Sequence, residues 1–82
     1  MDRKSIEDIV IESVCITYER DKSEISCETN IKEDLGGASI LMVGLVSLIE
    51  NELDVLVPLP VAASAKTIGE LVDKVEGILK KG

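Results

Sequence analysis

The 82-residue sequence contains no histidine, no tryptophan and no phenylalanine, and Tyr18 is its only aromatic residue. The absence of histidine excludes histidine-based catalytic triads, histidine proton shuttles and the usual histidine metal ligands. A single aromatic side chain also leaves too little surface for stacking nucleic-acid bases. We therefore expect no catalytic residues, no metal site and no nucleic-acid partner.

Positive charge is scarce, because nine lysines and arginines stand against sixteen aspartates and glutamates, for a net charge of −7. Such a charge repels phosphate backbones and anionic membranes and suits a protein that meets basic partner surfaces. Cys15 and Cys27 are too few for a disulfide scaffold and are expected to be free thiols. The apolar stretch from Leu41 to Ile49 is far too short to span a bilayer, and no signal peptide is visible. We expect a monomeric, cytoplasmic protein without stable membrane insertion.

Hydrophobic residues recur at helical spacing in three segments, which run from Ser5 to Tyr18, from Ser39 to about Asp54, and from Thr67 to the C-terminus. The first and last segments start with capping-box patterns, Ser5 with Asp8 and Thr67 with Glu70. The expected core stripes are Ile6, Val10, Val14 and Tyr18; Ile40, Val43, Val46, Ile49 and Leu53, widened by Leu45 and Leu48; and Ile68, Leu71, Val72, Val75 and Leu79.

Residues 21–38 form a long connection rich in Ser, Thr, Asn, Asp and Gly. A loop of this length in a compact domain is usually functional or pinned by its own apolar side chains. We expect Ile25, Ile31 and Leu35 to pin it, and Asp34 to belong to a turn.

Pro58 and Pro60 argue against a central strand over residues 55–61, because proline lacks the donor that a sheet needs. We expect an extended connector there, followed by a short helical turn over residues 61–64. The predicted fold class is all-α: a four-helix bundle with three long helices and one short third helix, and a long loop between helices one and two. It forms a single domain over residues 1–82.

The residues just before the second long helix carry the functional signal. Gly36 and Gly37 make a turn, and Ser39 follows at a helix start, where unpaired N–H groups favour a phosphate. A serine there is also a plain N-cap in many small proteins. Residues 33–36, Glu-Asp-Leu-Gly, with Ser39 three residues later resemble the site at which acyl carrier proteins attach 4′-phosphopantetheine. Their second helix with its exit, and the start of their last helix, are similar to residues 45–58 and 67–72.

The resemblance implies that Ser39 bears 4′-phosphopantetheine through a phosphodiester, and that the thiol of this arm holds an acyl group as a thioester. The protein would then be a carrier and phosphoprotein, not an enzyme. Its partners would be a phosphopantetheinyl transferase and dedicated acyl-transfer or acyl-ligase enzymes, with the acyl chain as covalent cargo. The pathway would be a specialised lipid, envelope or polyketide-type biosynthesis, with a fatty acyl or aminoacyl group among the candidate cargoes.

Several positions depart from the family pattern. Ala38 replaces the aspartate that precedes the serine, and Leu41 and Gly44 occupy positions that are acidic in the family. Residues 59–65 also lack charge. These departures favour a specialised carrier whose enzymes dock on an apolar patch, in which Leu41 and Met42 are either docking or core residues. The alternatives are an unmodified carrier-like domain acting as a protein–protein interaction module, and an unrelated helical bundle that binds a partner helix or a lipid.

Overall fold

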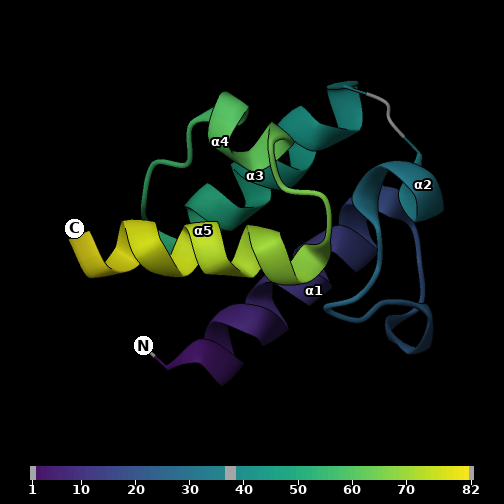
Figure 1. Cartoon of the computed structure of the whole chain (residues 1–82), viewed down its shortest axis with the longest axis horizontal. Coiled ribbons are helices and arrows are strands. Elements are labelled where there is room, and N and C mark those ends of the chain that lie inside the picture. The colour runs from purple at the N-terminus through teal and green to yellow at the C-terminus, as the bar shows by residue number, and fades with distance from the viewer. Residues whose placement is uncertain (1, 37–38, 82) are drawn as a thin grey trace.

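A computed structural model describes residues 2–36 and 39–81, apart from the side chains of Ser39 and Lys81. Figure 1 shows a bundle of helices, with bounds α1 (Arg3–Tyr18), η1 (a 3₁₀ turn, Lys22–Glu24), α2 (Ile31–Leu35), α3 (Ser39–Leu53), α4 (Leu59–Ala63) and α5 (Ile68–Lys81). No strand occurs in the described ranges, in which Asn30 and Thr67 form an isolated bridge. The predicted all-α bundle with three long helices is confirmed, and α2 is an additional short helix inside the predicted long loop.

The core lies where α1 packs against both α3 and α5, and where α4 closes over α3 and α5 (Figure 1). Its side chains are Ile6, Val10, Val14, Tyr18, Leu45, Val46, Ile49, Leu53, Val57, Ala62, Ala65, Ile68, Leu71, Val72 and Val75, joined by the loop residues Ile25, Ile31 and Leu35. All three predicted loop pins are therefore buried. The pinned loop explains how residues 21–36 stay attached to so small a bundle.

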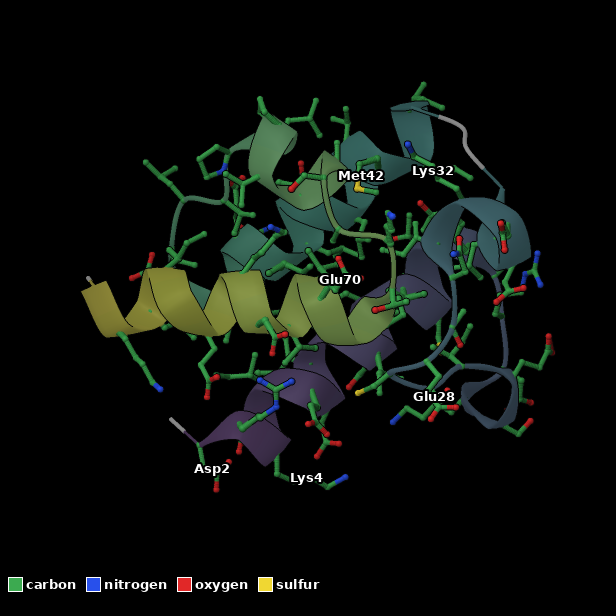
Figure 2. All side chains as sticks on the ribbon, viewed as in Figure 1. Asp2, Lys4, Glu28, Lys32, Met42 and Glu70 are labelled. Carbon is green, nitrogen blue, oxygen red and sulfur yellow. The ribbon has the colours of Figure 1, made fainter. Side chains whose placement is uncertain are left out.

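The start of α1 differs from the prediction. Asp2 is the N-cap, and its Oδ1 accepts a hydrogen bond from the backbone N–H of Ser5 at 2.9 Å. This bond lowers the pKa of the Asp2 carboxyl. Asp8, which we expected to complete a capping box with Ser5, instead pairs with Lys4 one turn earlier, at 3.2 Å. The prediction was wrong because aspartate caps a helix as well as serine does, and Asp2 precedes Ser5 (Figure 2).

Helix α3 buries the later part of its predicted stripe, Val46, Ile49 and Leu53, but not the first part. Ile40 and Val43, assigned to the core stripe, are 80% and 47% exposed, whereas Leu45 is fully buried. The helix carries no charged residue before Glu50. Its apolar residues therefore surround the helix and do not select one face. Its contacts with α1 and α4 therefore determine which side of α3 faces the core.

Helix α4 begins at Leu59, two residues before the predicted start. Pro58 is its N-cap, and Pro60 lies in the first turn, where the missing N–H of proline costs nothing. The preceding connector contains no strand; it starts with a turn at Asp54, whose φ is 54°, and Glu50 of α3 accepts a hydrogen bond from the backbone N–H of Val57 at 2.8 Å. This bond ties the exit of α3 back onto its own last turns.

Candidate functional site

The segment that leads into Ser39 is built on α2. Asn30 caps this helix by accepting a hydrogen bond from the N–H of Glu33 at 2.9 Å, and Asp34 accepts one from the N–H of Asn30 at 2.8 Å. Such reciprocal bonds satisfy donors at a helix start that otherwise lack partners. Asp34 is therefore a helix residue and not the turn residue that we expected. The pattern Asn-x-x-Glu-Asp was the sequence signal for α2, and our reading of the loop missed it.

Backbone hydrogen bonds attach the loop before α2, and α2 itself, to the start of α5. The N–H of Ile31 bonds to the carbonyl of Lys66 at 2.9 Å, and the N–H of Ile68 to the carbonyl of Thr29 at 3.1 Å. A third bond joins the N–H of Gly69 to the carbonyl of Cys27 at 2.8 Å. The approach to Ser39 therefore rests on the rigid N-terminal end of a long helix.

The chain leaves α2 through Gly36, whose φ of 88° lies in the region that glycine adopts without strain. The rest of the predicted glycine turn, Gly37, and the departure at Ala38 lie outside the described residues, and so does the side chain of Ser39. Ser39 is the first residue of α3. The backbone therefore confirms the prediction that Ser39 lies at the start of a helix.

An anionic phosphodiester fits the N-terminal end of α3. This helix is 15 residues long and has no acidic residue in its first turn. Its first N–H groups have no partner within the helix, and its dipole places partial positive charge at this end. A phosphate attached to Ser39 would meet favourable charge there, with no carboxylate from the first turn opposing it.

The surface next to this end is apolar. Ile40 and Val43 are largely exposed, while Leu41 and Met42 are half-buried and pack against the core. Of the two roles left open for Leu41 and Met42, docking or core, the structure therefore favours the core. Ile40 and Val43, which we had placed in the core, are the large apolar residues of α3 that are exposed to a partner.

A second apolar surface follows α3. Leu56 in the connector is 82% exposed and Leu59 at the start of α4 is 41% exposed. Helix α4 contains no acidic or basic residue in its first or last turn. The absence of charge noted in residues 59–65 therefore describes accessible surface, not only buried core.

The two cysteine thiols in the described part of the chain are not activated as nucleophiles. Burial raises the pKa of the Cys15 and Cys27 thiols, which are both free, so they stay protonated at neutral pH. Among the described residues, no cluster of three cysteine, aspartate or glutamate side chains is arranged to hold a metal ion. Within the same ranges, none of the helices has the length and apolar character needed to cross a membrane.

Comparison with known proteins gives a consistent result. The family model for the phosphopantetheine attachment site matches residues 8–75. The chain is 30% identical over 77 residues to the acyl carrier proteins of two strains of Porphyromonas gingivalis, covering 94% of each chain. It is 27% identical over 73 residues to the acyl carrier protein of Amoebophilus asiaticus, covering 89% of this chain and 86% of that protein. The matched residues include α2, α3 and α4 and most of α1 and α5.

Proposed function

This chain belongs to the acyl carrier protein family, and we propose that Ser39 is the residue that bears its prosthetic group. The family's covalent group is 4′-phosphopantetheine, and its members are carriers, not enzymes. The position of Ser39 as first residue of the long helix α3, directly after the short helix α2, is the observation that carries the assignment. The proposed carrier is a single domain over residues 1–82.

In this function the chain itself would hold the prosthetic group in place and would not carry out the chemistry. The arm supplies a thiol, on which we propose that the acyl cargo is held as a thioester. Ser39 would provide the ester oxygen, and the N–H groups of the first turn of α3 would stabilise the phosphate charge. Because the sequence has no histidine to act as a general base, the partner transferase would activate the hydroxyl.

Modification at Ser39 is tested by mass. Co-expression with a broad-specificity phosphopantetheinyl transferase should add one phosphopantetheine to the intact protein. Ser39→Ala should abolish the addition, whereas Ser47→Ala, on the exposed surface of the same helix, should leave it unchanged. The unloaded variants should show the same helical circular dichroism.

Two results would contradict this assignment. An addition that persists in Ser39→Ala would move the attachment site to another serine. A protein that no transferase modifies would favour the alternative, an unmodified interaction module, for which Ala38 in place of the family's aspartate is the supporting feature.

We further propose that the partner enzymes are dedicated to a specialised lipid, envelope or polyketide-type pathway and dock on apolar surface. The exposed Ile40 and Val43 beside Ser39, and Leu59 on α4, support this proposal. Exposed carboxylates mainly accelerate and select encounters with basic partners. A carrier without them on α3 before Glu50 should meet general fatty-acid enzymes slowly.

Adding acidic charge tests this second proposal, at Gly44, which occupies an acidic position of the family, and at the neighbouring exposed Val43. Val43→Glu combined with Gly44→Glu should increase acyl loading by a general fatty-acid acyltransferase severalfold at low salt, with the gain fading as salt rises. Both positions are exposed, and a Cβ at Gly44 makes only an ordinary 3.7 Å contact with Thr17. Lys22→Glu, which changes the net charge equally but lies in η1, is the matched control. Equal rates for all three proteins would show that the missing charges do not select partners.

A further inference from the structure

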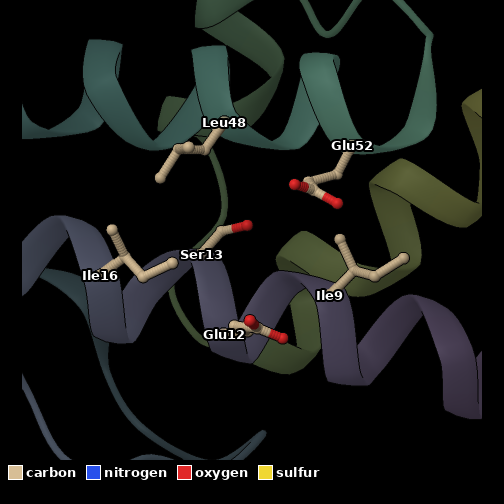
Figure 3. A pocket seen from close by; sticks show the side chains of 6 residues that line it. All are labelled: Ile9, Glu12, Ser13, Ile16, Leu48 and Glu52. Carbon is tan, nitrogen blue, oxygen red and sulfur yellow. The ribbon is translucent and has the colours of Figure 1, made fainter.

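A groove lies on the surface between α1 and α3, two helices that pack against each other. It contains a hollow of about 30 Å³ lined by Ile9, Glu12, Ser13, Ile16, Leu48 and Glu52. Figure 3 shows Leu48 and Glu52 directed from α3 toward the side chains of α1. The sequence prediction did not include this feature, because it depends on how the two helices pack.

The wall of the groove is apolar and accessible. Ile16 is 61% exposed, one of the largest exposed fractions among the apolar side chains described, while Ile9 and Leu48 are half-buried on either side. Ser13 is buried, and Figure 3 shows its hydroxyl directed into the space between the helices. Ile9, Ile16 and Leu48 together therefore offer apolar surface along which the methylene stem of a long side chain can lie.

The rim of the groove is acidic from both sides. Glu12 comes from α1 and Glu52 from α3, and both line the hollow. The ion pairs found in the described part of the chain use Glu7, Asp8, Asp73 and Glu76 as their acidic members, so Glu12 and Glu52 are available to a partner.

We propose that this groove is a docking site for a lysine side chain on the surface of a partner protein. The methylene stem would lie on Ile9, Ile16 and Leu48, with its ammonium group between the two rim carboxylates. A hollow of this size holds about one water-sized group. The compact ammonium of lysine fits it better than the planar guanidinium of arginine. A second copy of this chain is a poor occupant, because its charge of −7 repels its own kind.

The groove is separate from the proposed attachment site. Glu52 follows Ser39 by thirteen positions in the same helix, which corresponds to about 20 Å along its axis. Leu48, the lining residue of α3 nearest to Ser39, follows it by nine positions, or about 14 Å along the axis, so the groove and the attachment site do not share residues. Since the groove does not involve the prosthetic group, it can be tested on the unmodified protein, independently of Ser39.

The probe is a short alanine-based helical peptide with one lysine flanked by leucines, titrated into the isotope-labelled unmodified protein. Methyl NMR shifts should appear at Ile9, Ile16 and Leu48 and saturate with peptide concentration. The same peptide with acetyl-lysine, which keeps the stem and removes the charge, should bind about three- to tenfold more weakly, as expected for two partly exposed ion pairs.

Two variants complete the test. Glu12→Gln combined with Glu52→Gln should remove the preference for lysine over acetyl-lysine, whereas Glu24→Gln combined with Glu28→Gln, the same charge change in the exposed loop, should retain it. The proposal is overturned if both peptides bind alike, if the control pair loses the preference equally, or if the shifts spread over the acidic surface without saturating. It is also overturned if the methyl groups respond only to protein concentration, since the groove would then join two copies of the chain.

Discussion

Helices α3 and α5 have similar lengths, 15 and 14 residues, but they encode their buried faces differently. In α5, apolar residues alternate at helical spacing with charged ones. Ile68, Leu71, Val72 and Val75 are all fully buried, as predicted, and the fifth predicted residue, Leu79, is partly buried against the core. In α3, nearly every residue before Glu50 is apolar, and two of the predicted core residues are exposed. The charged face of α5 specifies its orientation, because charged side chains are rarely buried without partners. Most of α3 has no charged face, so its orientation is determined by packing against its neighbours.

The largest expected effect separates the two faces of α3. Ile49→Ala removes a fully buried side chain and should lower the free energy of unfolding by about 2–5 kcal/mol. Ile40→Ala, at an exposed position, should change it by no more than about 0.5 kcal/mol. Urea unfolding followed by circular dichroism measures both values. Similar losses for the two variants would mean that the rotation assigned to α3 is incorrect.

A pair of threonines should respond to the same substitution with opposite signs. Thr67 caps α5 by accepting a hydrogen bond from the N–H of Glu70 at 3.2 Å, so Thr67→Val should cost about 1 kcal/mol. In the described part of the chain, the buried Oγ1 of Thr17 on α1 has no hydrogen-bond partner. Thr17→Val should therefore raise the free energy of unfolding by about 1 kcal/mol.

Thermal unfolding of the two valine variants, with the double variant as a check of additivity, measures this difference. A loss of stability in Thr17→Val would indicate that the hydroxyl is paired, and that the contact between α1 and α3 is more polar than described.

The smallest effects concern glycines within the two helices. Gly77→Ala in α5 meets no atom within 4 Å, and Gly44→Ala in α3 makes only an ordinary contact, so each should stabilise the protein by up to about 1 kcal/mol. Gly69→Ala should instead destabilise it, because the new Cβ would lie 3.1 Å from the backbone carbonyl oxygen of Cys27.

Chemical unfolding of the three alanine variants provides the measurement. A stabilised Gly69→Ala variant would show that the loop can move away from α5, and that the attachment of the loop to this helix is looser than its backbone hydrogen bonds suggest.

The sequence by itself determined the features that depend on local patterns. The three long helices, the buried stripe of α5 and its Thr67 cap follow from spacing and charge over a few residues. The pinning of the loop by Ile25, Ile31 and Leu35 follows from the scarcity of other apolar residues in it. The start of a helix at Ser39 was also readable, since glycines precede it and an uninterrupted apolar segment follows.

Tertiary structure decided the features that need two segments to meet. Asp2 and Ser5 were both competent caps, and the turn between them is held to α5 by the ion pairs of Arg3 with Asp73 and Glu76. The rotation of α3 depends on α1 and α4, because its own sequence contains no charged face to keep in water. The groove between Ile16 and Leu48 is lined from both α1 and α3, so it exists only once these two helices pack together. Such features arise from packing between elements distant in the chain, and a pattern within one element contains no information about its neighbour.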